Sequence, residues 1–586
     1  MDTTANRPKT SLFLTLSDRF RDLFSGRRGR DLREHLTAYA MLAPALILIF
    51  TFGLFPVAFA LYVSLHKWLI LQSDFRGLGN YVSAIGNLAY IGAFALGLGA
   101  LYGAYRLVRT VLDQAKGQPR TVWLLALPGA LYAASAMAFL RWAYLQLPEF
   151  LNIARKMRGL ERTRDLFIRL LSEAFFVPEI FSAWKWFMGL FVLALIVSFF
   201  LLNRLRLKNN TAFQRNFAFI GLALAIGVGL LIFTSQSVSA AYLTALETGE
   251  DPGFWPQFIS IGSGAILLLI GLRLWSSAGG QENRNFFLRL IAATTLMVAA
   301  VLLIIEIPTI VASGDKDLWS GLRYTVFFSL GTVPFQLTIA LFLSVLLFQR
   351  LRGSEFFRIM YFIPYVTPAI AAASVFRLMF SDRISGPINS IMSWFGIPPQ
   401  AWLAEPKGVF TLLAGAIGIQ DFPASIIPSW VSPDLAQIFI NWFSGPSLAL
   451  VVIILLSIWT YVGYNTVIYL AGLANIDTEI TEAAEIDGAS RWQVFRHVTF
   501  PLLSPTTYFL SLIAVMGTFK AFNTIWVMRL CQSLGTVDTF SIVIFDEFFT
   551  KTRFGYASAL AFVLFFIILG LTYINNRIQG SRVFYG

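Results

Sequence analysis

Charged residues and cysteine are both scarce in this sequence of 586 residues. Only 13% of the residues are Asp, Glu, Lys or Arg, whereas soluble domains carry about 25%. The single cysteine, Cys531, excludes an intrachain disulfide framework and a cysteine-rich metal site. The histidines, His35, His66 and His497, are too scattered for a zinc motif. These absences argue against a soluble, a disulfide-stabilised and a zinc-binding protein.

A phosphate-binding loop of the form G-x-x-x-x-G-K-[S/T] is also absent. We therefore expect no cofactor in this chain, and if ATP drives the protein, the nucleotide and its Mg²⁺ must bind to a partner chain. The net charge of +13 could suggest a nucleic-acid partner. However, the basic residues cluster in short loops beside apolar runs, which is how orientation in a membrane is encoded. We expect no nucleic acid.

Long apolar runs dominate the sequence, in which 57% of the residues are hydrophobic. A transmembrane helix needs about 20 consecutive apolar residues. The sequence therefore predicts an all-α polytopic membrane protein with about twelve transmembrane helices. The predicted spans cover residues 38–64, 85–105, 121–141, 183–202, 217–236, 257–275, 289–311, 324–347, 357–379, 447–470, 502–527 and 556–575.

The basic loops alternate along the chain, which predicts its orientation. An Arg-rich tail over residues 1–36, without a signal-peptide cleavage site, is expected in the cytoplasm, and the parity of the spans places the C-terminus there too. The basic loop over 143–182 disagrees, because it falls on the outer side. Either an amphipathic helix over Leu151–Phe176 lies there, or a neighbouring span is re-entrant or misassigned.

A polar, helix-forming stretch from Ile476 to Pro501 separates the tenth and eleventh predicted spans. Asp477 can cap a first helix, which Gly488 would end. Ser490 and Gln493 have the spacing of a capping box for a second helix. Two interpretations remain open from these residues: an amphipathic loop on the bilayer surface, or a docking element.

The same stretch resembles the signature of permease subunits of bacterial ATP-binding-cassette (ABC) importers: E-A-A, three residues, G, nine residues, then I-x-L-P. The chain departs from it only in Val498 for Ile and Phe500 for Leu. The resemblance implies that the loop over 472–501 couples the permease to a separate ATPase. Small alanines permit close approach, a glutamate offers a charge-assisted contact, and a glycine permits the turn between the helices. The candidate coupling residues are Glu482, Ala483, Ala484, Asp487, Gly488 and Pro501.

The resemblance covers two blocks of the chain. The first, over 37–82, resembles the first core helix and its exit loop, and the second, over 319–586, resembles a type I importer permease core. Within the second block, G-P-I-N at Gly386–Asn389 and W-L-A-E-P at Trp402–Pro406 resemble outer-loop signatures. The intervening residues 83–318 are predicted to be an insert with about six extra transmembrane helices, whose role the sequence does not indicate. Within this insert, Gly99 and Gly103 have the spacing that allows close helix packing.

The resemblance implies a permease subunit of an ATP-driven sugar importer, similar to the large subunit of maltose/maltodextrin-type transporters. It implies a location in the bacterial inner membrane and no enzymatic activity in this chain. The implied partners are a second permease subunit, a homodimeric ATP-binding subunit, an extracytoplasmic solute-binding protein, the lipid bilayer and a carbohydrate. The helix count alone would also allow a secondary transporter driven by an ion gradient, but we find neither two related halves nor a well-placed intramembrane acidic residue.

Four polar or aromatic residues are candidates for the transport path. They are Tyr464, Asn465, Thr518 and Asn523. Sugars present hydroxyl groups and apolar ring faces, for which such side chains are suitable partners, and the first three fall near sugar-contacting positions of the maltose-type family. Alternatively, these side chains satisfy one another between helices, because an unpaired buried polar group costs about 1–3 kcal/mol. Lys520 could pair with Asp546 or Glu547, and we assign it no role.

Overall fold

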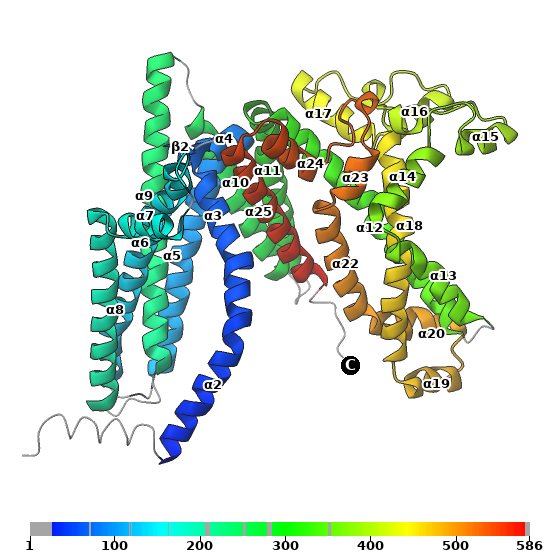
Figure 1. Cartoon of the computed structure of the whole chain (residues 1–586). Coiled ribbons are helices and arrows are strands. Elements are labelled where there is room, and N and C mark those ends of the chain that lie inside the picture. The colour runs from blue at the N-terminus through cyan, green and yellow to red at the C-terminus, as the bar shows by residue number, and fades with distance from the viewer. Residues whose placement is uncertain are drawn as a thin grey trace, which may run out of the picture. The chain divides into compact units, whose positions relative to one another are not determined.

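The computed structural model describes residues 26–69, 72–116, 118, 120–161, 163–204, 211–249, 253–277, 284–349 and 353–579 (Figure 1). Most of the predicted tail over 1–36 therefore lies outside the described residues. The chain divides into two compact units, Met1–Ser64 and Leu65–Gly586.

The described part of the first unit is one helical run. It contains α2 (Gly26–Ile49), a π-helical turn η1 (Phe50–Leu54) and α3 (Phe55–Ser64). Pro56 has no N–H to donate to the carbonyl of Phe52, and the widened turn lies where this helical hydrogen bond is missing. The run is long and apolar enough to cross a membrane, as predicted for 38–64.

The second unit begins with a short hairpin and continues into the predicted insert. The hairpin pairs β1 (His66–Trp68) with β2 (Gln72–Phe75) antiparallel. The helices that follow are α4 (Gly79–Ile85), α5 (Leu88–Ala115), η2 (Arg120–Leu125), α6 (Ala126–Lys156), α7 (Arg164–Phe175), α8 (Pro178–Arg204), α9 (Thr211–Thr248), α10 (Phe254–Ser277) and α11 (Arg284–Ser313).

Helices α5, α6, α8 and α9 pack as a bundle, and α10 packs along α11. The bundle core includes Val111, Leu125 and Phe213. The close crossing of α5 and α9 is at Gly97 and Gly227, where an added Cβ on either glycine would lie 3.3 or 3.1 Å from the carbonyl oxygen of the other. The packing predicted for Gly99 and Gly103 is wrong, because no neighbouring atom lies within 4 Å of an added Cβ at either position. They are on another face of α5.

The basic loop over 143–182 contains a separate helix. Residues up to Lys156 belong to α6, and α7 starts after Thr163, whose side chain accepts a hydrogen bond from the N–H of Leu166. A helix is thus present in this stretch, but it is shorter than the one considered over Leu151–Phe176.

The remaining helices follow the insert. They are α12 (Lys316–Phe348), α13 (Ser354–Val366), α14 (Ala369–Met379), α15 (Pro387–Trp394), η4 (Trp402–Ala404), α16 (Val409–Ala416), η5 (Ala424–Ile426), α17 (Pro433–Phe443), α18 (Leu448–Ala474), α19 (Thr478–Ile486), α20 (Arg491–Val494), η6 (Phe495–Thr499), α21 (Phe500–Leu502), α22 (Ser504–Phe519), α23 (Asn523–Met528), η7 (Cys531–Ser533), α24 (Phe540–Phe545), η8 (Asp546–Thr550) and α25 (Phe554–Gln579).

Helix α18 is the centre of this region and packs against α12, α13 and α22. Its Leu450, Ile453 and Leu456 are fully buried and share a cluster with Phe328 of α12. At Gly463 the backbone of α13 comes so close that an added Cβ would lie 1.7 Å from the carbonyl oxygen of Tyr361. Only glycine permits this approach.

The prediction of an all-α membrane protein is confirmed. Among the described residues, ten helices are long and apolar enough to cross a membrane, or up to twelve if each of two bent pairs is one span. The pairs are Ser354–Val366 with Ala369–Met379, bent by 93°, and Arg491–Leu502 with Ser504–Phe519, bent by 61°. Each predicted span overlaps one of these helices or pairs.

The eleventh predicted span, 502–527, is wrong at its end. Helix α22 stops at Phe519, and a separate short helix, α23, begins at Asn523. The hydroxyl of Ser541 donates a hydrogen bond to the Phe519 carbonyl (3.0 Å), which a continuing helix would use for its own next turn.

The two ends of the insert lie next to each other. The N–H of Asp315, just before α12, donates to the carbonyl of Ala84 at the end of α4 (3.0 Å). An added Cβ on Gly314 would lie 2.8 Å from the same carbonyl oxygen, and one on Gly86 would lie 2.3 Å from Oγ of Ser313. The chain therefore leaves and returns at one point, although the predicted boundaries at 83 and 318 stay a prediction.

Candidate coupling loop and transport path

The first helix of the candidate coupling loop, α19, is capped at both ends. The carboxylate of Asp477 accepts from the N–H of Glu479 (3.1 Å). At the other end Gly488 has φ +84°, its N–H donates to Glu485 O (3.0 Å), and the N–H of Ala489 donates to Ala484 O (3.0 Å). These two bonds form a Schellman motif, which fixes the turn after the helix.

The second helix of the loop starts with the predicted capping box. The N–H of Ser490 donates to Oε1 of Gln493 (2.7 Å), and the N–H of Gln493 donates to Oγ of Ser490 (3.4 Å). The helical path then passes through the π-helical turn η6 and α21. Pro501 lies inside α21, and the chain turns into α22 after Leu502.

The loop exposes most of its surface. No side chain of α19 is buried, and Glu482, Ala483, Asp487 and Gly488 are exposed, while Ala484 is half-buried. Four large apolar side chains are also exposed: Ile480 (46%), Ile486 (86%), Trp492 (65%) and Phe500 (48%). The loop therefore combines a fixed backbone with apolar groups that nothing in the described chain covers.

The two spans that flank the loop touch each other close to it. An added Cβ on Gly472 of α18 would lie 2.6 Å from Oγ1 of Thr506 and 3.1 Å from a methyl carbon of Leu503. One turn earlier, the hydroxyl of Tyr469 donates to Oγ1 of Thr507 (3.2 Å). A displacement of the loop would therefore act on α18 and α22 together.

Two of the candidate path residues, Tyr464 and Asn465, are neighbours on α18. The ring of Tyr464 stacks on Tyr365 of α13, with ring centroids 4.6 Å apart. Asn465 is 4% exposed, and its Nδ2 makes no hydrogen bond within the described part of the chain. An unpaired buried amide of this kind favours a partner outside the chain or a bound water.

The other two candidates, Thr518 and Asn523, are in different environments. Oγ1 of Thr518 lies 2.9 Å from Oγ of Ser329 on α12 and 2.9 Å from the Val515 carbonyl, so this side chain is satisfied between helices. Asn523 is exposed at the start of α23 and does not belong to the same span as Thr518. The structure thus keeps Tyr464 and Asn465 together and separates Asn523 from the others.

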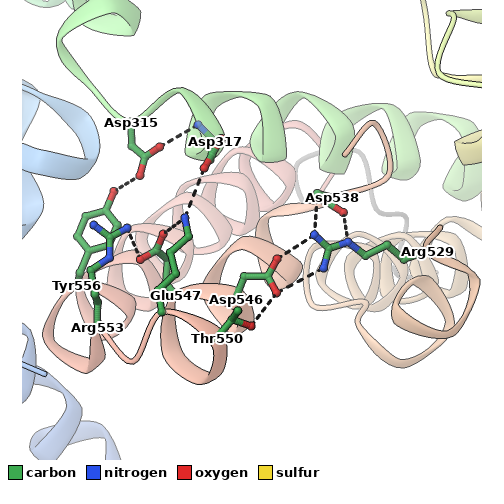
Figure 2. A network of polar contacts seen from close by, with 10 residues as sticks. Asp315, Asp317, Arg529, Asp538, Asp546, Glu547, Thr550, Arg553 and Tyr556 are labelled. Carbon is green, nitrogen blue, oxygen red and sulfur yellow. Dashed lines mark hydrogen bonds and ion pairs between the residues drawn. The ribbon is translucent and has the colours of Figure 1, made fainter. Parts of the chain in front are cut away.

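Sequence reasoning missed a network of charged residues at the opposite end of the core, which Figure 2 shows. Glu547 is 1% exposed at its side chain and pairs with Lys551 (2.8 Å) and with Arg553. Lys551 also lies 3.7 Å from Asp317 in the first turn of α12. This part of the network joins η8 and the start of α25 to α12.

Arg529 holds the second half of the network. It lies 2.7 Å from Asp538 and 2.9 Å from Asp546. Asp546 therefore pairs with Arg529, and Glu547 with Lys551 and Arg553, rather than with Lys520. The sequence D-E-F-F-T-K-T-R over 546–553 is dense in charge and signals local pairing, but nothing in it indicates Asp317 or Arg529.

Asn389 connects the two predicted outer-loop signatures. Its Oδ1 accepts from Nε1 of Trp402 (2.7 Å) and from the N–H of Gln400 (3.1 Å). Its Nδ2 donates to the carbonyls of Arg383 (3.0 Å) and Gln400 (3.1 Å). A single amide that is 1% exposed thus holds the G-P-I-N and W-L-A-E-P segments together.

The described residues contain no group of three or more His, Cys, Asp or Glu side chains placed to hold a metal ion. The arrangement is instead a helical membrane bundle with a capped polar loop at one end and polar side chains within the spans. The fold and this site define a multi-span membrane protein of the transport class.

Comparison with known proteins identifies the family. Residues 321–581 match the family described as "Binding-protein-dependent transport system inner membrane component". The chain is 31% identical to the lactose transport system permease protein LacF of Rhizobium radiobacter, over 44% of this chain and 76% of the relative. It is 30% identical to a probable ABC transporter permease protein of Pyrococcus horikoshii, over 44% and 74% respectively. It is 28% identical to the arabinooligosaccharides permease protein AraP of Bacillus subtilis, over 45% and 71%.

The chain therefore belongs to the family of permeases of carbohydrate ABC importers. Among solved structures, it is similar to a chain of a bacterial alginate ABC transporter in complex with alginate pentasaccharide-bound periplasmic protein, at 18% identity and a TM-score of 0.36, over 45% of this chain and 79% of that one.

Proposed function

We propose that this chain is a permease subunit of an ATP-driven sugar importer and that the loop over 472–501 transmits the work of a separate ATPase. The observation that carries the proposal is the state of α19. This helix is fixed by Asp477 at its start and by the Gly488 turn at its end, yet none of its side chains is buried. A helix whose shape is fixed while none of its side chains is buried is suited to pack on another chain.

The chemistry of the loop fits a protein partner. Ile480, Ile486 and Trp492 supply exposed apolar area, and such residues carry much of the energy of protein interfaces. Glu482 adds a carboxylate for a basic group on the partner, and Ala483 leaves room for its backbone. We propose as this partner a homodimeric ATP-binding subunit, which would hold the ATP and Mg²⁺ that this chain is not expected to bind.

The contact between α18 and α22 gives the loop a route to the transport path. Movement of the loop would displace both helices through Gly472 and Thr506. Tyr464 and Asn465 lie two turns back along α18, and we propose that these two side chains, with Thr518 and Asn523 as further candidates, contact sugar. The stacked pair Tyr464 and Tyr365 offers aromatic surface for an apolar ring face.

The family supports the proposed assembly. A second permease subunit would complete the path, and an extracytoplasmic solute-binding protein would deliver the sugar at the end of the core opposite to the loop. The chain would then span the inner membrane, with both termini in the cytoplasm. The lactose and arabinooligosaccharide systems of the relatives favour an oligosaccharide, and maltose-like sugars are the first to test.

The test is to coexpress this chain with the second permease, the ATPase and the binding protein, and to measure sugar-stimulated ATP hydrolysis in lipid nanodiscs. The double variant Glu482→Lys with Gly488→Pro is expected to assemble but to lose the stimulation. Glu161→Lys, an exposed charge reversal in the insert, is the matched control and should retain it. Full stimulation in the double variant would refute the coupling role, and ion-driven uptake by this chain alone would favour a secondary transporter.

A further inference from the structure

A cleft of about 590 Å³ lies beside the first turns of α12 and α18. It is at the end of the core opposite to the candidate coupling loop, because α18 runs from Leu448 at the cleft to Ala474 at the loop. Its lining comes from α12, from the segments over 406–411 and 421–424, and from the end of α17. Volumes of about 300–1,000 Å³ are typical of small-molecule sites.

One wall of the cleft is firmly attached to the start of α18. The N–H of Val409 donates to Pro446 O (2.8 Å), and the N–H of Leu448 donates to Lys407 O (3.2 Å). Between them, Gly408 approaches so closely that an added Cβ would lie 2.0 Å from the carbonyl oxygen of Ser444. The cleft is therefore a built feature of the fold, and its wall carries Lys407.

The cleft contains two cations without carboxylate partners. Arg323 is half-buried; its Nη2 donates to the hydroxyl of Tyr324 (2.8 Å), and its guanidinium carbon lies 4.7 Å from the centroid of that ring. Among the described residues, no carboxylate oxygen lies within 4.0 Å of the guanidinium nitrogens of Arg323 or of Nζ of Lys407. Two carboxylates are nevertheless close to the cleft: Asp421 lines it, and Glu405 accepts from the backbone N–H of Lys407 (3.0 Å). A half-buried cation without a counter-charge is unfavourable, and an anionic ligand would remove this cost.

The rest of the lining is suited to a sugar. Thr411 and Asn441 supply a hydroxyl and an amide, Asp421 supplies an acceptor for sugar hydroxyl groups, and Phe422 supplies an apolar ring face. An anion such as free phosphate would use the cations alone and leave these groups without a role. A carboxylate on a polyhydroxylated ring uses both kinds of group.

We propose that this cleft binds a saccharide that carries a carboxylate, with Arg323 and Lys407 on the carboxylate and Asp421 and Asn441 on the hydroxyl groups. The inference rests on the proposed function as a sugar importer and adds a substrate class to it: acidic sugars of about two rings, given the volume. A site here would hold the sugar at the mouth of the bundle before it reaches Tyr464 and Asn465.

The experiment measures binding directly, so that it is separate from ATP hydrolysis. The full chain in nanodiscs is titrated calorimetrically with digalacturonate and with maltose. We expect digalacturonate to bind at least tenfold more tightly than maltose. Arg323→Gln should weaken digalacturonate at least tenfold and Lys407→Gln at least threefold, each with little effect on maltose, whereas Arg383→Gln, an exposed arginine of the neighbouring cleft, should have no effect.

Equal affinity for the two sugars would overturn the proposal, as would unchanged digalacturonate binding in both cleft variants. Competition by inorganic phosphate at the same concentration as digalacturonate would also overturn it, because it would show a plain anion site. Lys407 is exposed, so its variant is expected to fold even if that of Arg323 does not. If sugar-stimulated ATP hydrolysis persists while digalacturonate fails to bind, this inference is refuted and the proposed function stands.

Discussion

The two ends of the core differ in what their charged residues do. In the network of Figure 2, Asp317, Asp538, Asp546 and Glu547 each lie within 4.0 Å of a cation of the same chain. In the loop over 472–501 at the other end, no acidic side chain has such a partner in the described chain. The acidic side chains of the network are paired within the chain, whereas those of the loop face solvent or a partner.

The acidic side chains at the two ends also differ in burial, and burial decides how much the loss of each charge would cost in stability. The carboxylate of Glu547 is 1% exposed, so its charge is removed from water and depends on its partners. The carboxylates of α19 are exposed, where an ion pair contributes little to folding. Changes in the network should therefore alter stability, whereas changes in the loop should alter the stimulation of ATP hydrolysis.

Glu547→Gln should have the largest effect on stability. It leaves Lys551 and Arg553 without their shared carboxylate and should lower the free energy of unfolding by about 3 kcal/mol, the lower end of the range for a buried pair, because both cations reach solvent. Thermal unfolding of the solubilised chain measures the effect. Glu482→Gln is the control and should leave Tm unchanged; an equal loss in both variants would contradict the division.

Asn389→Asp should have the next largest effect. It tests whether a neutral buried side chain that holds two segments together contributes to stability as the charged Glu547 does. The substitution places an oxygen where Nδ2 now donates to the carbonyls of Arg383 and Gln400. We expect a loss of about 2 kcal/mol, because buried acceptors are then left unpaired. The same unfolding measurement applies, and a loss smaller than that of the half-buried Asn441→Asp would contradict the role given to Asn389.

Gly488→Ala tests the loop and should affect ATP hydrolysis more than stability. A Cβ at φ +84° costs about 1 kcal/mol, so we expect little change in Tm but a clear loss of sugar-stimulated ATP hydrolysis. Gly159→Ala is a matched control, with φ +80° and open space around it in the insert. If the control reduces ATP hydrolysis equally, general strain rather than the position of the loop is responsible.

The smallest effect concerns pH. Burial raises the pKa of Asp538 above its ordinary value, although the charge of Arg529 acts to lower it. The native state therefore binds this proton more readily than the unfolded state, so the contribution to stability is largest below about pH 4 and declines as pH rises through the raised pKa. Asp538→Asn should flatten the decline of Tm as pH rises above about pH 4; identical slopes would contradict it.

Sequence reasoning succeeded where the information is local. Apolar runs predicted the spans, and the caps at Asp477, Gly488 and Ser490 form as the residue spacing indicates. It failed at the end of α22, because hydropathy continues past Phe519, while the helix ends there and the Phe519 carbonyl accepts from Ser541, a residue 22 positions away. The network could not be predicted from the sequence for the same reason, because its contacts join distant residues. Asp315, for example, accepts from the hydroxyl of Tyr556, 241 positions along the chain.

The meeting of Ala84 and Asp315 also has a consequence for the order of events during synthesis. The two residues are 231 positions apart, so their hydrogen bond cannot form until the whole intervening stretch has left the ribosome. At about 5–20 residues per second, this takes roughly 10–50 s. During that time α4 has neither α12 nor α25 to pack against, while the bundle of α5, α6, α8 and α9 can already close on itself. The insert is thus the first large part of the second unit that is able to fold, and the transport core is completed around it afterwards.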